Sequence, residues 1–507
     1  LSITFAEIAT HNHFVLDRGG NVFKQTAPAI KLRAEMDEQE YLRVLGALNS
    51  SLSCFWLKQK SYPKSGDSVT WANRYAFNGK TVEAIPMPDN VPIEIVRMLD
   101  DTARLRADSY HNFGKNPGVL WGAAENAGDS DLRLKTKLIA LQEELDWGLY
   151  KEYGISDSEL VFHELDQVPG VLPGQRAFEI VLAREVQGGQ GDPSWFVRHG
   201  IEPIVEIPLE WPENYRQLVQ RRIGLIESDS MIGMLERPEY KRRWAEEPWV
   251  KRQERALRGW LLDRIESREH WFDRRGRPSV RSVGQLADAL GREDDIVSVL
   301  ELWSGQRDVD LVAMLTKLLT EEVVPYLASW RLKEPALRKW EEWKTTWDLQ
   351  RREDKGEDVG PIPVPPKYTT ADFRKQSYWS HRGKLDVPKE RFIVYPEAEL
   401  STDRSMLLGW AGWNHAEQFL ALASHMDRMT ADGAGDDRLV PVLAGLHELM
   451  PWVQQWHGEL DPAYGVSLGD FAAQEVEQRR ARLGVSFDDL VGWRPPKATR
   501  GRRKKAS

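Results

Sequence analysis

The alternation of apolar and polar side chains near the start of the chain predicts two strands. Residues His13–Asp17 alternate and are rich in strand formers, and the alternation resumes over Val22–Thr26. The run RGGN at residues 18–21 supplies residues that tolerate a positive φ, as a tight turn requires. We therefore predict a β-hairpin over residues 10–32, in which Pro28 limits the second strand to an edge or an end.

Helical spacing replaces this alternation after the predicted hairpin. Apolar side chains recur on one face from Leu42 to Trp56. Asp37, with Glu40 three residues later, forms a capping-box pattern that marks the start of the helix. Residues 61–77 are polar with scattered aromatic side chains, which predicts a loop.

Beyond residue 95 the pattern is helical for most of the chain. Leu138, Leu141, Leu145 and Leu149 fall on one stripe, which is typical of a buried helix face. The predicted fold class is α+β and predominantly α, with a small mixed α/β module at the N-terminus followed by helical domains. Changes in pattern and composition predict six regions: a mixed α/β module (1–95), a helical connector (96–155), a Trp-rich charged helical domain (156–355), a Pro-rich linker with an irregular segment (356–400), a C-terminal helical domain (401–492) and a basic disordered tail (493–507).

Charge is distributed unevenly along the chain. The formal net charge is −9, yet residues 1–80 carry ten Lys/Arg against seven Asp/Glu, a net of +3, which leaves −12 for the remainder. The last fourteen residues hold seven basic side chains and no acidic one. Basic ends around an acidic middle can orient a protein on DNA, whereas the tail by itself is more typical of a solvated disordered segment.

Composition also limits the compartment and the class of protein. The single cysteine, Cys54, excludes a disulfide framework and any multi-cysteine zinc site. No apolar run approaches the ~20 residues that a membrane span requires. We therefore expect a cytoplasmic protein without membrane contact. Because the chain begins at Leu1 and not at a methionine, we also expect it to be part of a longer protein.

Several short motifs suggest enzymatic chemistry but lack its context. His11 and His13 would share one face of a strand and could chelate a metal, but no third ligand is evident, so we assign no metal site. Amino-methyltransferases hold the target amine in a D/N-P-P-aromatic loop, and residues 192–195 (DPSW) and 461–464 (DPAY) each lack its second proline. No Gly-rich strand-to-helix loop precedes either string. We interpret both as turns at helix N-termini, and predict that this chain alone binds no S-adenosylmethionine and holds no catalytic residue.

Two further patterns have a structural interpretation beside a functional one. Trp340, Trp343 and Trp347 lie at helical spacing and could stack bases, but such stripes more often form a core or a seam between helices. The string EYK at residues 239–241 contains the E-x-K element of some restriction nucleases. It lies inside a helical charge cluster, so a nuclease is the weakest hypothesis.

The front of the chain carries the residue types that bind DNA. A two-stranded ribbon fits the major groove, where Asn or Gln can pair with adenine and Arg or Lys with guanine. The predicted hairpin holds five side chains suited to base contacts: Asn12, His13, Arg18, Lys24 and Gln25. The basic stretch that follows holds six suited to phosphate contacts: Lys58, Gln59, Lys60, Lys64, Arg74 and Lys80. Physical grounds alone leave this interpretation evenly balanced against a solvated surface.

The same residues resemble a known family. The strings ATHNHFVLDRGGNVFKQTAPAIKL, LRVLGALNSSLSCFWLKQ and IPMP resemble the target-recognition region of large adenine-specific DNA methyltransferases. Later blocks, among them LIESDSMIGMLERPEYKRRWAEEPW and LLGWAGWNHAEQ, resemble the PglX family, the methyltransferases of BREX phage-defence systems. The resemblance extends over nearly the whole chain.

The resemblance implies a function for a complete protein of which this chain would be the C-terminal portion. A further domain would bind S-adenosylmethionine and methylate adenine N6 in host DNA, which marks self against phage. Double-stranded DNA would be the partner, together with other BREX components. Residues 1–95 would then be the target-recognition module, which holds the duplex while adenine leaves the stack. The alternative hypothesis is a protein-interaction scaffold whose acidic, Trp-rich helices dock other defence proteins.

Overall fold

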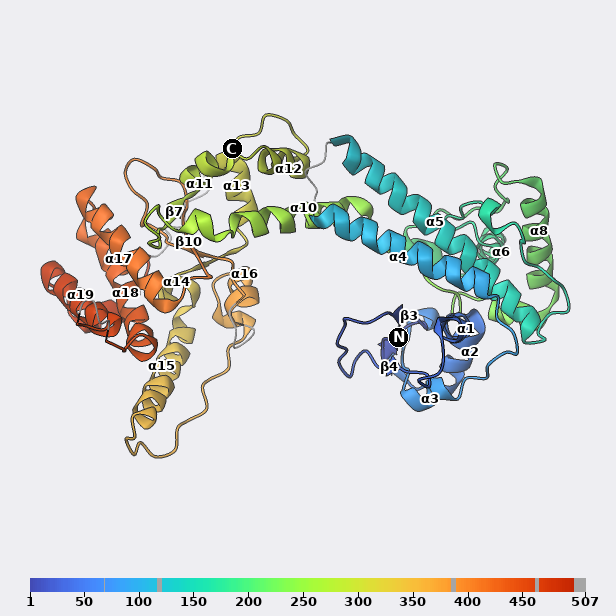
Figure 1. The fold of residues 1–507 in the computed structure, drawn as a ribbon, viewed down its shortest axis with the longest axis horizontal. Coiled ribbons are helices and arrows are strands. Elements are labelled where there is room, and N and C mark those ends of the chain that lie inside the picture. The colour runs from blue at the N-terminus through green and yellow to red at the C-terminus, as the bar shows by residue number, and fades with distance from the viewer. Residues whose placement is uncertain (68, 116–120, 384–388, 461–464, 497–507) are drawn as a thin grey trace, which may run out of the picture. The chain divides into compact units, whose positions relative to one another are not determined.

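A computed structural model describes residues 1–67, 69–115, 121–383, 389–460 and 465–496. The chain divides into two compact units, Leu1–Gln253 (unit 1) and Glu254–Ser507 (unit 2) (Figure 1). Helices make up 56% of the structure and strands 8%, which confirms the predicted, predominantly α fold with a minor β component. In the parts of the chain that the structure describes, no helix is both long and apolar enough to cross a membrane.

The first sheet of unit 1 has the strand order β3-β1-β4 and is antiparallel throughout. β1 (Ser2–Phe5) lies in the centre, between β3 (Phe14–Asp17) and β4 (Ala29–Ile30). The prediction of a β-hairpin is therefore wrong, because residues 22–26 form no strand. β1 takes the place beside β3 because its apolar side chains meet those of β3 on a buried face, whereas Val22 is 98% exposed.

A second sheet lies in residues predicted to be a loop. Its strand order is β2-β6-β5, formed by β2 (Ile8–Ala9), β6 (Arg74–Ala76) and β5 (Pro63–Ser65). The expected loop over residues 61–77 thus contains two short strands. They pair with each other and with a segment near the N-terminus, so the pairing depends on contacts that a local pattern does not show.

The helix predicted from apolar spacing is present, but it is broken in two. α1 (Glu38–Leu48) begins after Asp37, whose carboxylate accepts a hydrogen bond from the backbone N–H of Glu40 at 3.1 Å, as the capping pattern predicts. α2 (Ser51–Lys60) starts anew with Ser50 as its N-cap. The chain therefore changes direction between the two helices instead of continuing one long helix.

Long helices form the framework of unit 1. α4 (Ile93–Lys115) and α5 (Trp121–Glu152) run side by side (Figure 1). The predicted stripe of four leucines lies on α5 and is buried, which confirms it as a core face. The remaining helices that begin in unit 1 are α3 (Gly79–Glu83), α6 (Ala177–Gln187), α7 (Ser194–His199), α8 (Glu213–Ser228), α9 (Ser230–Leu235) and α10 (Trp249–Ile265).

Unit 2 contains one four-stranded sheet of order β7-β10-β9-β8. Its strands are β7 (Arg281–Ser282), β8 (Val323–Pro325), β9 (Phe392–Val394) and β10 (Leu407–Trp410). Only β8 and β9 pair in parallel, and the other described pairs of this sheet are antiparallel. The sheet joins segments that are far apart in the sequence, so it ties the helices of unit 2 to one core.

Helices account for most of the rest of unit 2. In α15 (Glu334–Asp354) the tryptophan stripe packs across α18 (Asp436–Trp456), with Trp343 and Trp347 centred 5.8 and 5.5 Å from Trp452. The stripe is therefore a seam between helices. The other α-helices are α11 (Val283–Leu290), α12 (Asp294–Ser304), α13 (Leu311–Leu319), α14 (Ala328–Arg331), α16 (Gln376–Tyr378), α17 (His415–Ala431), α19 (Leu468–Leu483) and α20 (Phe487–Gly492).

A buried ion cluster lies in the core of unit 1. The ammonium of Lys241 is fully buried and lies 3.1 Å from Glu143 Oε2, 3.1 Å from Asp146 Oδ2 and 2.9 Å from Glu236 Oε1. The Tyr150 hydroxyl also donates to Glu236, at 2.6 Å. The cluster joins two turns of α5 to the segment after α9, and its members hold one another's charges out of water.

Two more buried ion pairs extend this polar core. Arg176 pairs with Glu179 at 2.8 Å at the start of α6. Arg222 of α8 pairs with Glu144 of α5 at 2.6 Å and also donates to the backbone carbonyl of Leu160. Each pair is less than 3% exposed, so each guanidinium depends on its own carboxylate for compensation.

Three carboxylates around one ammonium leave an excess of negative charge in the core. Burial raises the pKa of Glu143 to about 7 from an ordinary value of 4.5, against the opposing pull of Lys241. Unfolded Glu143 releases its proton near pH 4.5, whereas the folded protein holds it up to about pH 7. The stabilising effect of the protonated group is therefore complete below about pH 4.5 and is lost as the pH rises through about 7.

Replacing Glu143 with Gln, which mimics the protonated carboxyl, should remove this pH dependence. The free energy of unfolding of the variant relative to wild type should increase between about pH 4.5 and 7, by up to about 3 kcal/mol at ~1.4 kcal/mol per pKa unit, and then level off. Urea titrations at several pH values measure the difference. Glu152→Gln, at the exposed end of α5, is the control and should show no such trend. A difference for Glu143→Gln that is constant with pH would contradict the prediction.

Candidate nucleic-acid interface

The break between α1 and α2 is held by hydrogen bonds to the backbone of β3 and to a side chain of α5. The Asn49 side chain accepts from Phe14 N at 3.0 Å and donates to Phe14 O at 2.9 Å, which locks it to the first residue of β3. Gln142 of α5 donates to the Asn49 carbonyl at 3.2 Å. The LNS string that resembles the methyltransferase target-recognition region is thus the point where sheet, helix pair and α5 meet.

Asn12 belongs to this junction and not to an open surface. Its amide donates to the backbone carbonyls of Leu48 at 2.7 Å and Ser50 at 2.8 Å, and the residue is 5% exposed. Both amide hydrogens are therefore used inside the protein, and the side chain is out of reach of a base edge. The assignment of Asn12 to base contacts is corrected to a structural role.

Two basic residues of the predicted interface are also committed elsewhere. Lys58 is buried and donates to the backbone carbonyl of Glu239, and burial lowers the pKa of its ammonium. Arg18 forms ion pairs with Glu38 at 2.6 Å and with Asp100 at 2.7 Å. Lys58 is therefore engaged inside the protein, and the exposed guanidinium of Arg18 is shared by two carboxylates. The sequence shows the charge of such residues but not their partners.

The remaining basic residues gather on the second sheet. Lys64 lies on β5 and Arg74 on the neighbouring β6, where Arg74 pairs in register with Ser65, and Lys60 ends α2 just before β5. All three are exposed. We call Lys60, Lys64 and Arg74 the basic edge. Tyr62, between them in sequence, is 84% exposed and offers a ring that a base could stack on.

A ladder of backbone hydrogen bonds connects the β3–β4 loop to this sheet. Glu7 N donates to Thr26 O at 3.1 Å, and Phe77 N donates to Glu7 O at 2.7 Å. The loop, dark blue in Figure 1, extends away from α1 and α2 and carries Lys24 and Gln25, both exposed. These two residues therefore lie on the same side of unit 1 as the segment that leads into β2.

Two other predicted residues, Gln59 and Lys80, are close in sequence to the basic edge. Gln59 is exposed, and its amide lies 3.3 Å from the Tyr240 hydroxyl. Lys80, at the start of α3, is exposed. Asp67, the only acidic residue between residues 58 and 80, is paired with Arg198 at 2.7 Å. The acidic charge of this stretch is thus neutralised locally, and the positive charge of the basic edge is left in excess.

The two neighbouring histidines face different surroundings. Burial, together with the charges of Lys58 and Arg243, holds the pKa of His11 well below its ordinary value. His13 is exposed and its Nδ1 lies 2.8 Å from Nη2 of Arg242. The rings do not converge on a common point, and among the residues described no group of three or more His, Cys, Asp or Glu side chains could hold a metal ion.

The structure confirms the helix-turn interpretation of residues 192–195. The Asp192 carboxylate accepts from the backbone N–H of Ser194 at 2.9 Å and from its hydroxyl at 2.6 Å, at the start of α7. Trp195 is buried and donates to Glu179 at 3.1 Å. This turn does not fit the loop that would hold a target amine beside S-adenosylmethionine, because its polar and aromatic groups are already engaged. The similar string at 461–464 lies outside the described residues.

The EYK string likewise has a structural role. Lys241 is the centre of the buried ion cluster, while the Glu239 carboxylate accepts from the Thr70 hydroxyl at 2.7 Å. The carboxylates around Lys241 are at most 4% exposed, so water and a phosphodiester have no access to them. The cluster cannot act as the metal site of a nuclease in this conformation.

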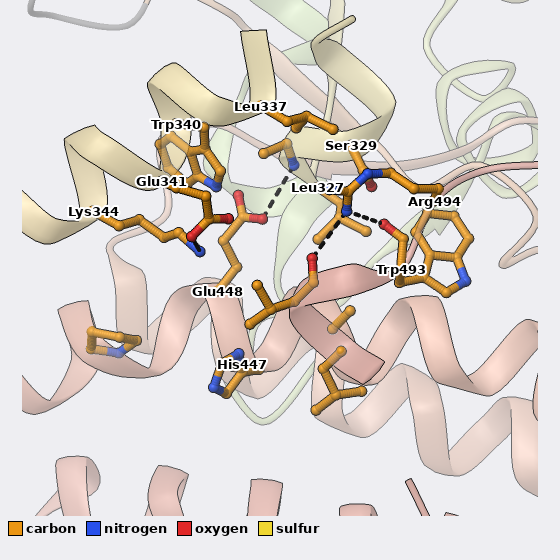
Figure 2. A pocket seen from close by; sticks show the side chains of 15 residues that line it. Leu327, Ser329, Leu337, Trp340, Glu341, Lys344, His447, Glu448, Trp493 and Arg494 are labelled. Carbon is orange, nitrogen blue, oxygen red and sulfur yellow. Dashed lines mark hydrogen bonds and ion pairs between the residues drawn. The ribbon is translucent and has the colours of Figure 1, made fainter. Parts of the chain in front are cut away.

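Unit 2 contains a small cavity between α14, α15, α18 and the end of the chain. Figure 2 shows Glu448 reaching the backbone of Ala328, while Arg494 donates to the carbonyls of Val491 and Trp493. The cavity measures about 90 Å³, below the ~300 Å³ at which pockets for cofactor-sized ligands begin. It has room for a few water molecules.

Arg242 contacts one of the predicted residues, His13, and sequence analysis did not indicate this contact. It lies 229 residues from His13 in the chain, yet its Nη2 is in hydrogen-bond contact with that ring. The only local signal was its membership of the block with the sequence EYKRRW. Neither spacing nor composition indicates that this block returns to the start of the chain.

Comparison with known proteins identifies the family to which the chain is similar. A family model described as a domain of unknown function, DUF7008, matches residues 138–504. The chain is 46% identical over 526 residues to the adenine-specific methyltransferase PglX of Streptomyces coelicolor. The match covers 100% of this chain but 43% of the relative, of which it corresponds to the C-terminal part. No solved structure matches the chain.

Replacing Asn12 with Ala should destabilise unit 1 and not only alter DNA binding. The change leaves two buried carbonyls without their donor, which costs about 1–3 kcal/mol. A lower melting temperature in the absence of DNA is the expected result, with exposed Asn90→Ala as the control that leaves it unchanged. An unchanged melting temperature combined with loss of preference at one base pair would instead restore the base-contact role.

Proposed function

The chain belongs to the DUF7008 family, and from that membership and its similarity to an adenine-specific methyltransferase we propose that it is the DNA-recognition and assembly portion of such an enzyme. Unit 1 would hold duplex DNA against the second sheet and the β3–β4 loop. The methyl transfer itself would belong to the rest of a complete protein, in which S-adenosylmethionine would supply the methyl group.

The basic edge is the observation that carries this proposal. Lys60, Lys64 and Arg74 are exposed on one small sheet and the helix end beside it. Within the described part of the chain none of the three forms an ion pair, whereas most other arginines of unit 1 do. Exposed cations attract the phosphate backbone and release its counterions, which gives affinity without sequence preference.

Preference for a base would come from the β3–β4 loop. Gln25 is exposed on that loop, and a Gln amide can make two hydrogen bonds to adenine in the major groove. Lys24 beside it would contact guanine or a phosphate. An enzyme that flips a base must hold the rest of the duplex meanwhile. Phosphate contacts from the sheet and base contacts from the loop would divide that task.

A protein-docking function is the second candidate. Trp456 at the end of α18 and Leu460 after it are 62% and 68% exposed, an apolar surface on unit 2 that DNA does not need. By the family resemblance, the partners would be other components of a BREX phage-defence system. The two functions can coexist, since the observations that favour them lie on different units.

Removing one charge from the basic edge should weaken binding to every duplex alike. For Lys64→Gln we expect the slope of log K against log salt to fall by about 1, because one phosphate contact is lost. Fluorescence anisotropy over a range of salt concentrations, on a candidate site and a scrambled duplex, measures it. Lys151→Gln, at an exposed lysine of α5, is the control. If Lys64→Gln leaves the slope unchanged, as the control does, DNA binding does not use this sheet.

Replacing Gln25 with Ala should weaken binding at one base position only, unlike the loss of a phosphate contact. The loss of two hydrogen bonds to one base is expected to cost about 1–3 kcal/mol at that position, while the affinity for scrambled DNA and the salt slope stay the same. A panel of duplexes with single substitutions, measured with wild type and variant, separates the two effects. A uniform loss over the panel would assign Gln25 to the phosphate contacts instead.

A further inference from the structure

Arg242 is a cation without a counter-ion. Its Nη2 lies 2.8 Å from His13 Nδ1, its Nη1 lies 3.5 Å from Gln142 Oε1, and its guanidinium lies 4.8 Å from the centre of the Trp244 ring. All of these partners are neutral or aromatic. Across the residues that the structure describes, Arg242 makes no ion pair, although the side chain is half-buried.

The nearest carboxylates are already committed. Asp146 and Glu246 both act on Arg242 through their charge. Asp146 lies 3.1 Å from Lys241, and Glu246 lies 2.6 Å from Arg106. Burial therefore lowers the pKa of Arg242 to about 10, because no free anion offsets the loss of hydration.

The side chain that Arg242 contacts is open to solvent. His13 is exposed, and the charge of Arg242 lowers its pKa to about 4, so the ring is neutral at pH 7. A neutral imidazole that accepts from Arg242 through Nδ1 carries its hydrogen on Nε2. Nε2 also lies 3.3 Å from Nη2 of Arg242. The pair holds guanidinium N–H groups and one imidazole N–H, which are the kind of donors that an oxyanion requires.

We propose that Arg242 and His13 form a phosphate-binding site that takes a backbone phosphodiester of duplex DNA. The proposal rests on the proposed function and adds an arginine from a distant segment to the DNA-holding face. It also moves His13 from base contact to phosphate contact.

The position of His13 suits a duplex bound at the basic edge. His13 follows Ala9 of β2 by four residues, and four extended residues span at most ~14 Å. A major groove is ~12 Å wide. The proposed phosphate site therefore lies within about 14 Å of β2, a distance similar to the width of the groove.

Two measurements on the full chain test the site. In the first, the salt dependence of duplex binding is compared for wild type, Arg242→Gln, Arg242→Lys and the control Arg221→Gln, at an exposed arginine of α8. We expect Arg242→Gln to weaken binding roughly tenfold near 0.1 M salt and to lower the salt slope by about 1. Arg242→Lys keeps the charge and should retain most of the slope, and Arg221→Gln should match wild type.

The second measurement needs no DNA. The pKa of His13 is followed by NMR in protein with labelled histidine, with and without inorganic phosphate, and the His13→Gln variant identifies the signal. We expect phosphate to raise the pKa of His13 from about 4 toward its ordinary value of 6.5, because an anion stabilises the imidazolium. Protein in which Arg242 is replaced by Gln should lose most of this response.

The outcomes separate this inference from the proposed function. If Lys64→Gln lowers the salt slope but Arg242→Gln changes nothing, the basic edge stands and the Arg242–His13 site is refuted. If wild type binds no duplex, the proposed function fails, and a phosphate-dependent pKa of His13 would still support the site. Absence of both responses overturns the site as well. If Arg242→Gln does not fold, the site is tested by the salt slope of Arg242→Lys and by the response of the His13 pKa to phosphate in the wild-type protein.

Discussion

The ammonium of Lys241, enclosed by three carboxylates, is the constraint on which unit 1 depends. Glu143 and Asp146 come from α5, and Glu236 follows α9, so a single cation joins the long central helix to a segment about a hundred residues later. If the cation were lost, the carboxylates would be left uncompensated in a dry core, which costs several kcal/mol. Because Lys241 is fixed inside, the next residue, Arg242, is carried to the surface beside His13. The buried Lys241 cluster thereby helps to set the position of the contact between Arg242 and His13.

Sequence patterns located the helices better than the sheets. The leucine stripe of α5 and the Asp37 cap depend on neighbours within a turn or two, and both are present. Strand pairing depends on distant segments. Residues 22–26 alternate correctly, but β1 supplies a better apolar face, so it takes the place beside β3. The break at Asn49 was also hidden, since apolar spacing continues through it, while the backbone of Phe14 that the Asn49 side chain binds belongs to β3.

For the candidate interface, the sequence indicated polar and basic residues but not the environment of each. Lys60, Lys64 and Arg74 are exposed as a solvated basic stretch should be. Asn12 and Lys58 have the same polarity, yet both are buried with backbone carbonyls as partners. Burial of a polar group is decided by which carbonyls the fold leaves unpaired, and that is a property of the tertiary structure. Arg242 shows the converse, because in the described part of the chain it forms no ion pair and the carboxylates near it are bound to other cations.

The separation between the α1–α2 junction and the β3–β4 loop has a consequence for evolution. Residues 21–26 of the loop are exposed except Phe23, which is partly exposed, and none belongs to the buried core. The junction beneath uses Asn12 and Asn49 to fix the start of β3 to the helices. Substitutions in the loop therefore carry little penalty in folding, whereas those at the junction are costly. Variation can accumulate at the tip without disturbing its support. Lineages could therefore exchange this loop and keep the junction beneath it intact.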